Sequence, residues 1–218
     1  MNTNPTGKVD IEVDEYVLGI LKLLGLYGKY LASDDPHKVL RAAWRQLWAT
    51  PREFVQGLAV LGDFNFTLDL CAEAHTAKCS RYLGPGSDIA EDAFDVVWGT
   101  LLQGGHGWCN MPFNSIPRWV EGMMATGQHV MIAPDRTDQE WWHTLKRSSN
   151  CHETFVRGRP KFIPPAGVKD SGPAGGVAVW VIGHHERRLD ECLDLAEILR
   201  VGRQACADID GADGGSRE

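Results

Sequence analysis

The chain has 218 residues, of which 43% are hydrophobic, enough to bury the core of one domain with modest additions. Its formal net charge of -7 excludes a protein that binds polyanions over its whole surface, although a local basic patch can still meet phosphates. The six cysteines are scattered without a Cys-x-x-Cys pair, which indicates reduced thiols in a cytoplasmic protein.

Neither a metal site nor a membrane segment is expected. Cys71, His75 and Cys79 are spaced by four, but a structural zinc normally has four protein ligands. The apolar run over residues 17–26 is too short to cross a bilayer and contains Lys22.

Helices are expected in the first quarter of the chain. Apolar spacing predicts one helix over residues 10–31 and another that opens at Asp35-Pro36 and carries apolar residues up to position 47. The segment 48–51 then breaks the pattern. Thr50 is expected to cap a third helix, with Pro51 at its first position.

Strands and helices alternate in the rest of the chain. Polar residues stand at the ends of two predicted strands, Asp69 and Asn110, so we expect both to face one crevice at the carboxyl ends of the strands. The pattern predicts a three-layer α/β domain. Strands are expected over residues 64–70, 107–110, 129–133, 153–156 and 175–182, helices over 117–126, 137–146 and 187–207, mixed loop and helix over 72–82, a long loop before residue 175, and a mobile tail from residue 211.

The pentapeptide at residues 109–113, Cys-Asn-Met-Pro-Phe, carries the most specific chemistry. An aromatic amine is a poor nucleophile, and acceptors that hold both of its N–H groups aim the nitrogen lone pair at a methyl donor. The Asn110 side-chain oxygen and the Met111 carbonyl can be these acceptors, and Phe113 can stack on the ring. The pattern predicts methyl transfer to the amino group of a nucleobase, which must be flipped out of duplex DNA.

Met111 stands where such enzymes usually have proline. Methionine keeps the acceptor carbonyl, and Pro112 after it favours an extended backbone. It also brings an additional N–H and a less rigid φ, so we expect a looser geometry. The alternative is that residues 110–113 form an ordinary turn from a strand into a helix.

Six motifs, in this order and spacing, resemble the phage-type DNA N6-adenine methyltransferases, the Dam-like family of phages and prophages. The resemblance covers residues 47–182. The motifs are Trp48-x-Thr50-Pro51, Phe66-x-Leu68-Asp69-x-x-Ala72, Ala77-Lys78-Cys79-x-x-Tyr82, Trp108-Cys109-Asn110-x-Pro112-Phe113, Pro134-x-Arg136-Thr137-Asp138 and Arg157-Gly158-Arg159-x-Lys161-Phe162.

The resemblance implies a Rossmann-like S-adenosylmethionine-dependent methyltransferase sheet with flanking helices. It implies a methyltransferase domain over residues 47–183, an N-terminal helical extension over 1–46, and a C-terminal helix and tail over 184–218. It assigns the amine-binding, catalytic loop to Asn110, Met111, Pro112 and Phe113.

The resemblance also implies a cofactor site. The segment Thr50-Pro51 would line the methionine end of the cofactor, and Asp69 would either bind its ammonium group or cap the next segment. No glycine-rich loop follows Asp69. Trp48 is a cofactor contact or a core residue, and Asp88 contacts the adenine moiety or is simply solvated. The predicted cofactor-binding residues are Trp48, Thr50, Pro51, Asp69, Ala72, Asp88 and Asn110.

A basic patch is predicted between residues 141 and 169, where six Lys and Arg residues accompany a single acidic residue, Glu153. Guanidinium groups suit bidentate contacts with phosphate or guanine. The alternatives are a salt bridge of Arg136 to Asp138 or Glu140, and a solvated charged surface for the others. The predicted DNA-binding residues are Arg136, Arg157, Arg159 and Lys161.

The sequence therefore predicts a site-specific DNA methyltransferase that transfers a methyl group from S-adenosylmethionine to adenine N6. It is expected to be a monomer or homodimer, cytoplasmic, and of phage or prophage type in a bacterial host. Two alternatives stay open. The acceptor can be cytosine N4 or RNA, or the chain can be a catalytically silent DNA-binding relative in which Met111 is a sign of decay.

Overall fold

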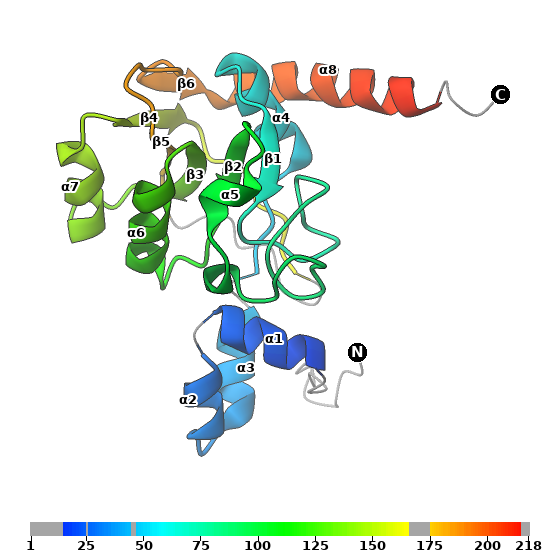
Figure 1. Ribbon diagram of the computed structural model, residues 1–218, viewed down its shortest axis with the longest axis vertical. Coiled ribbons are helices and arrows are strands. Elements are labelled where there is room, and N and C mark those ends of the chain that lie inside the picture. Colours follow the sequence, from blue (N-terminus) through cyan, green and yellow to red (C-terminus); the bar gives the residue numbers. More distant parts are fainter. Residues whose placement is uncertain (1–14, 25, 45–46, 166–174, 215–218) are drawn as a thin grey trace.

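The computed structural model describes residues 15–214, except residues 25, 45–46 and 166–174. The predicted disorder before residue 9 and most of the predicted long loop before residue 175 lie outside this part. The described elements are the helices α1 Glu15–Leu23, α2 Tyr27–Leu31, α3 Pro36–Trp44, α4 Arg52–Leu61, α5 Trp98–Leu101, α6 Ile116–Thr126, α7 Glu140–Arg147 and α8 Leu195–Gly214, the short 3-10 helix η1 Ala93–Asp95, and the strands β1 Phe66–Asp69, β2 His106–Cys109, β3 His129–Pro134, β4 Cys151–Arg157, β5 Val177–Ile182 and β6 Cys192–Asp194 (Figure 1).

The strands form one six-stranded sheet in the order β1-β2-β3-β5-β4-β6. β1, β2 and β3 are parallel, so their carboxyl ends lie at one edge of the sheet. β5 is antiparallel to both of its neighbours, β3 and β4, and β6 pairs parallel with β4. The predicted α/β class is confirmed as a mixed sheet with flanking helices.

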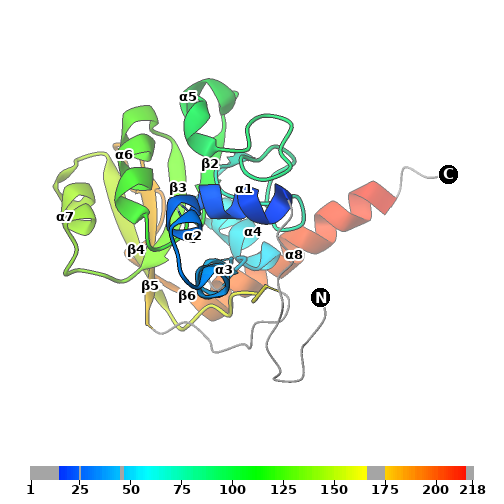
Figure 2. The same ribbon diagram turned by 90° about the horizontal axis from the view of Figure 1, so that it is seen from below.

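Two helical layers cover the two faces of the sheet (Figure 2). Because side chains alternate along a strand, Val130 and Ile132 of β3 face the core formed with α4 and α8. Met131 and Ala133 face the other core, which contains Trp98 of α5 and residues of α6 and α7. The central strands are buried on both faces, as the valine-rich runs in their sequences require.

Two glycines let α4 and α8 pack closely. A Cβ atom on Gly202 of α8 would lie 1.7 Å from the backbone oxygen of Glu53 in α4. A Cβ on Gly57 of α4 would lie 2.1 Å from the backbone oxygen of Ile198 in α8. Neither contact tolerates a side chain, so these positions fix how α8 sits on the domain. The last turns of α8 project beyond the sheet (Figure 1).

The N-terminal helices α1, α2 and α3 form a separate small core around Val17, Ile20, Leu21 and Leu40. The prediction of one helix over residues 10–31 is wrong, because α1 ends at Leu23 and α2 begins at Tyr27. Glycines at positions 25 and 28 lower helix propensity there. Residues 10–14 of that prediction lie outside the described residues.

Thr50 does not cap α4, which corrects a second prediction. Pro51 occupies the N-cap position, and no side chain makes a cap hydrogen bond there. Pro51 at N-cap rather than at the first helical position moves Thr50 out of the helix. Its side chain is thereby free to serve another purpose.

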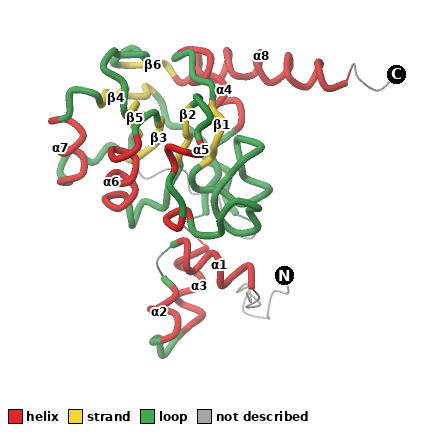
Figure 3. The backbone as a smooth tube through the Cα atoms, in the orientation of Figure 1, coloured by secondary structure: helices red, strands yellow, loops and turns green. Residues whose placement is uncertain are grey.

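The connection from β1 to β2 is mostly loop (Figure 3). Residues 72–82 contain turns and bends where some helix was expected, and η1 and α5 were not predicted. Gly84 in this connection has a φ of 140°, and a Cβ there would lie 2.1 Å from the Ala72 carbonyl oxygen. The loop therefore folds back on the segment that follows β1.

The C-terminal helix begins later than expected. Residues 187–194 were predicted as helix, but Cys192–Asp194 form β6 on the edge of the sheet, and α8 begins at Leu195. α8 then continues to Gly214, so the predicted tail from residue 211 is wrong for residues 211–214. The predicted domain boundaries at 46/47 and 183/184 stay predictions. None of the described helices is long and apolar enough to cross a bilayer.

Candidate active site

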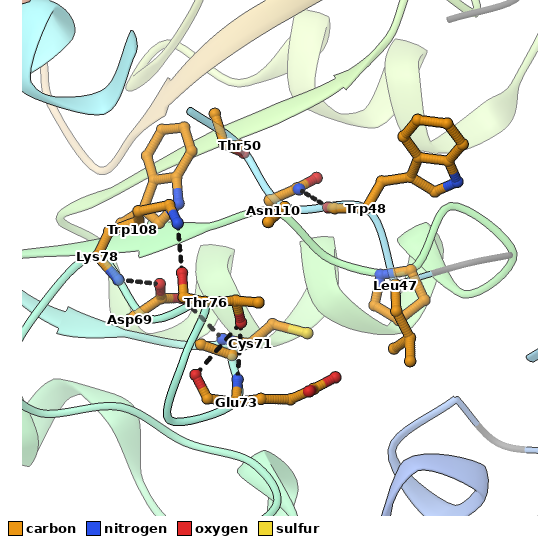
Figure 4. A pocket seen from close by; sticks show the side chains of 13 residues that line it. Leu47, Trp48, Thr50, Asp69, Cys71, Glu73, Thr76, Lys78, Trp108 and Asn110 are labelled. Carbon is orange, nitrogen blue, oxygen red and sulfur yellow. Dashed lines mark hydrogen bonds between the residues drawn. The ribbon is translucent and has the colours of Figure 1, made fainter. Parts of the chain in front are cut away.

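A cavity lined by both apolar and polar residues lies where β1 and β2 end (Figure 4). It holds about 490 Å³ of space free of atoms, part of it open to solvent. Three segments build it: the stretch before α4, the loop after β1 and the loop after β2. The lining residues are Leu47, Trp48, Ala49, Thr50, Asp69, Cys71, Ala72, Glu73, Thr76, Lys78, Trp108, Asn110 and Pro112.

Strand pairing brings Asp69 and Asn110 to the same cavity. Asp69 pairs with Trp108 in the parallel ladder, and the Leu70 N–H donates to the Trp108 carbonyl at 2.8 Å. The two strands therefore end at the same level. The prediction that these two strand ends share one crevice is confirmed.

A short bridge brings a distant segment to the cavity. The Ala49 N–H donates to the Ile163 carbonyl at 3.0 Å, and the Ile163 N–H donates back at 2.8 Å. Ile163 therefore lies beside the segment that lines the cavity, although it is separated from it by more than a hundred positions in the sequence.

Asn110 is held in one orientation. Its side-chain Nδ2 donates a 2.8 Å hydrogen bond to the Trp48 carbonyl (Figure 4). The Trp48 carbonyl would repel an amide oxygen, so this contact requires Nδ2 to face Trp48 and leaves Oδ1 pointing the other way. Among the described residues no donor is bonded to Asn110 Oδ1, which leaves this oxygen as an available acceptor.

The backbone at Met111 also keeps an available acceptor. No group in the described part of the chain donates to its carbonyl. Its N–H, which a proline would lack, donates to the Cys109 sulfur. Burial raises the pKa of the Cys109 thiol well above its usual value, and this hydrogen bond offsets only part of that rise. The Met111 side chain is buried in the core, so the residue also anchors the loop.

The rest of this loop turns into α6. The Pro112 carbonyl accepts hydrogen bonds from the Ser115 N–H and hydroxyl, both at 3.1 Å. The Phe113 side chain is 41% exposed, unusual for a ring of this size. An exposed aromatic beside two free acceptors suits a planar ligand.

Asp69 is buried, with 2% of its surface exposed. Its carboxylate accepts the backbone N–H groups of Cys71 at 3.2 Å and Lys78 at 3.0 Å. Burial nevertheless raises its pKa to about 6, because these hydrogen bonds and the Lys78 charge only partly offset desolvation. The carboxylate thus caps the following loop and at the same time attracts a cation into the cavity.

Sequence reasoning gave no role to several lining residues, above all Lys78, Glu73 and Thr76. The only sequence signal for Lys78 was its place in the family-like motif Ala77-Lys78-Cys79. Its half-buried ammonium donates to the Thr76 carbonyl, and burial lowers its pKa. The loop conformation that brings these residues together was not predictable from periodicity.

The donor set of the cavity fits the polar end of S-adenosylmethionine. The Thr50 hydroxyl is buried and has no hydrogen-bond partner in the described part of the chain, so a ligand group entering the cavity would satisfy it. Asp69 and Lys78 supply one charge of each sign. Of the other predicted cofactor residues, Trp48 and Ala72 line the cavity, while Pro51 and the exposed Asp88 lie outside its lining.

The predicted DNA-binding residues fall into two pairs. Arg136 makes two hydrogen bonds to Asp138, at 2.8 and 2.9 Å, and Arg157 makes two to Asp194, at 3.1 and 2.6 Å. The salt bridge considered as an alternative for Arg136 is therefore present.

Arg159 and Lys161 differ from that pair, because each is exposed and has no ion-pair partner among the described residues. They precede Ile163, which pairs with Ala49 of the cavity lining, by four and two positions. Lys146 and Arg147 of the basic patch are paired with Glu153 and Glu140.

In the described part of the chain, no group of three or more His, Cys, Asp or Glu side chains is arranged to hold a metal ion. All six cysteines are free thiols.

Fold and site together define an α/β protein with a cavity at the carboxyl ends of parallel strands, the usual ligand position in such sheets. Residues 38–203, about three quarters of the chain, match the family model described as DNA N-6-adenine-methyltransferase (Dam). The chain belongs to this family, which indicates a DNA adenine methyltransferase, and the resemblance to Dam-like enzymes is confirmed. A comparison with curated proteins finds no match.

Proposed function

We propose that the chain transfers a methyl group from S-adenosylmethionine to N6 of adenine at defined sequences in DNA, on a Rossmann-like sheet. The observation that carries this proposal is the presence of two free acceptors on consecutive residues, Asn110 Oδ1 and the Met111 carbonyl. Their loop contributes Asn110 and Pro112 to the lining of the cavity that contains Asp69, while Met111 and Phe113 lie outside that lining. When bound, the cofactor supplies an electrophilic methyl group on a sulfonium.

The residues of the chain do the alignment. Asn110 Oδ1 and the Met111 carbonyl each accept one N–H of the adenine amino group, which directs the nitrogen lone pair into the cavity. Phe113 stacks on the extruded ring, and its exposure leaves it available for this. Alignment alone can supply a large part of the rate enhancement of a direct displacement.

Trp48 connects the two halves of the site. Its carbonyl orients the Asn110 amide, and its side chain lines the cavity where Asp69 and Thr50 would meet the methionine end of the cofactor. A change that disturbs residues 47–50 should therefore affect both cofactor binding and base positioning.

Arg159 and Lys161 are proposed to hold the DNA backbone. Residues 159, 161 and 163 are exposed while residues 160 and 162 are buried, and Ile163 pairs with Ala49 of the cavity lining. This alternation leaves both free cations open to solvent in the segment that leads to the cavity lining, which suits contacts with phosphates. Arg136 and Arg157 are weaker candidates, because binding DNA would require breaking their ion pairs.

The test is to incubate the protein with methyl-labelled S-adenosylmethionine and duplex DNA, RNA or no nucleic acid. Digestion to nucleosides and mass spectrometry then identify the product. The proposal expects label in N6-methyladenine from DNA only. Label in N4-methylcytosine or in RNA would show that adenine N6 of DNA is not the acceptor. DNA binding that needs no cofactor, without any methyl transfer, would indicate a catalytically silent relative.

Sequence specificity is tested in the same reaction. Sequencing that detects modified bases, applied to long DNA methylated by the protein, should find the mark confined to one short sequence. A mark spread over all adenines would contradict the site-specific part of the proposal.

A further inference from the structure

Lys78 is the single cationic residue among the thirteen that line the cavity, where it faces two acidic ones, Asp69 and Glu73. Its ammonium donates to the Thr76 carbonyl, and it has no ion pair within 4.0 Å in the described part of the chain. An ammonium group has three donors, so two remain for a ligand.

Keeping a lysine half-buried without an ion pair costs free energy, because desolvation disfavours the charged form. The lowered pKa of Lys78 shows this cost. An anion bound in the cavity would remove it. Asp69 is not that anion, since it lies beyond ion-pair distance and is occupied by two backbone N–H groups.

The ligand of the proposed function carries the complementary charges. Its amino-acid end has one ammonium and one carboxylate on the same carbon atom. Asp69 and Lys78 are contributed by the same short loop, nine positions apart, and the Lys78 N–H bond to Asp69 ties them together. Asp69 and Lys78 can therefore bind the ammonium and the carboxylate of one amino-acid group at the same time.

We propose that Lys78 binds the α-carboxylate of the cofactor and that it, together with Asp69, selects for an intact amino-acid end. Lys78 is a positioning residue, because it does not touch the transferred methyl group. This inference rests on the proposed use of S-adenosylmethionine, but it assigns a separate, testable role to one residue.

The experiment is calorimetric titration of three ligands into the wild-type protein and the variant Lys78→Met. The ligands are S-adenosylmethionine, its decarboxylated form, which keeps the ammonium, and 5′-methylthioadenosine, which lacks the whole amino-acid end. Met keeps the unbranched stem of the side chain and removes the ammonium group. Lys29→Met, at an exposed lysine of α2 outside the cavity lining, is the matched control.

For Lys78→Met we expect the affinity for S-adenosylmethionine to fall about 10- to 100-fold, the usual effect of losing a hydrogen-bonded charge pair. The affinity for the decarboxylated ligand should be unchanged or higher. That for 5′-methylthioadenosine should be unchanged, which also shows that the variant cavity is intact. Lys29→Met should bind all three ligands like wild type.

Three results would overturn the inference. If Lys78→Met binds S-adenosylmethionine as tightly as wild type, Lys78 does not hold the carboxylate. If the variant loses all three ligands equally, Lys78 maintains the cavity without reading the carboxylate. If the wild type binds no S-adenosylmethionine, the proposed function itself fails, which is a different outcome from the first two.

Discussion

Ionisation of Asp69 should make the protein less stable as pH rises, in the opposite direction from most paired carboxylates. Burial raises its pKa from 3.8 to about 6 in the folded state, a change worth about 3 kcal/mol. A raised pKa means that the folded state binds more protons than the unfolded state between these values. The stability contribution is therefore full below about pH 3.8 and is lost as pH rises through about 6.

The measurable part lies at mild pH. Between pH 5 and pH 8 the two pKa values give a loss of about 1.4 kcal/mol from this one group. Two histidines act in the opposite direction, since the pKa of the buried His129 is lowered to about 3 and that of the partly buried His184 to about 4. The pH dependence of the free energy of unfolding therefore contains both effects. Comparison with a variant that lacks the Asp69 carboxylate isolates the contribution of Asp69.

The assay is urea unfolding of the wild-type protein and Asp69→Asn at pH 5, 6, 7 and 8 without ligand. The Asn variant loses one backbone hydrogen bond, a pH-independent offset, so the slope of the difference carries the information. Wild type should lose about 1.4 kcal/mol relative to the variant over this range. Asp88→Asn, an exposed carboxylate, controls for removing one charge. A difference that does not change with pH would refute the reasoning.

Three further predictions concern packing, the amine loop and DNA. In urea unfolding, Gly202→Ala should lower the free energy of unfolding by about 3 kcal/mol, because the new Cβ would lie 1.7 Å from a backbone oxygen of α4. Gly211→Ala on the same helix is the control, because a Cβ there would have nothing within 4 Å. It should leave the free energy of unfolding unchanged or raise it by up to about 1 kcal/mol. Met111→Pro keeps the acceptor carbonyl and should retain the initial rate of methyl transfer within about tenfold; complete loss would show that the backbone N–H matters. Arg159→Ala should weaken DNA binding and reduce the slope of log affinity against log salt concentration by about 1. Arg136→Ala should change this slope less, because Arg136 is already paired with Asp138. Equal effects of the two variants would argue against a distinct role for the unpaired Arg159.

The meeting of Asp69 and Asn110 could be predicted from the sequence, because parallel strands end at the same edge of a sheet. Helix α6 and strand β3 were also predictable, since Gly127, with a φ of 68°, stops the helix just before the strand begins. These features depend on local periodicity and on a general rule of sheet topology, and both are written in the sequence.

Other features depended on contacts between distant residues. Residues 187–194 have helical spacing, but the open edge of β4 offers hydrogen-bond partners and turns Cys192–Asp194 into β6. Arg157 looked free because its partner, Asp194, lies 37 positions away. Lys78 was missed because loop geometry, not spacing, brings it into the cavity.

The central claim is that Asn110 Oδ1 holds the amino group of the target base. Single-turnover methyl transfer with Asn110→Ala tests it most directly, with Asn114→Ala, an exposed asparagine four positions further on, as the matched control. We predict a fall of at least about a hundredfold in rate for Asn110→Ala, comparable to losing one aligned hydrogen bond at a reacting group. Transfer by Asn110→Ala at the rate of wild type and Asn114→Ala would contradict it.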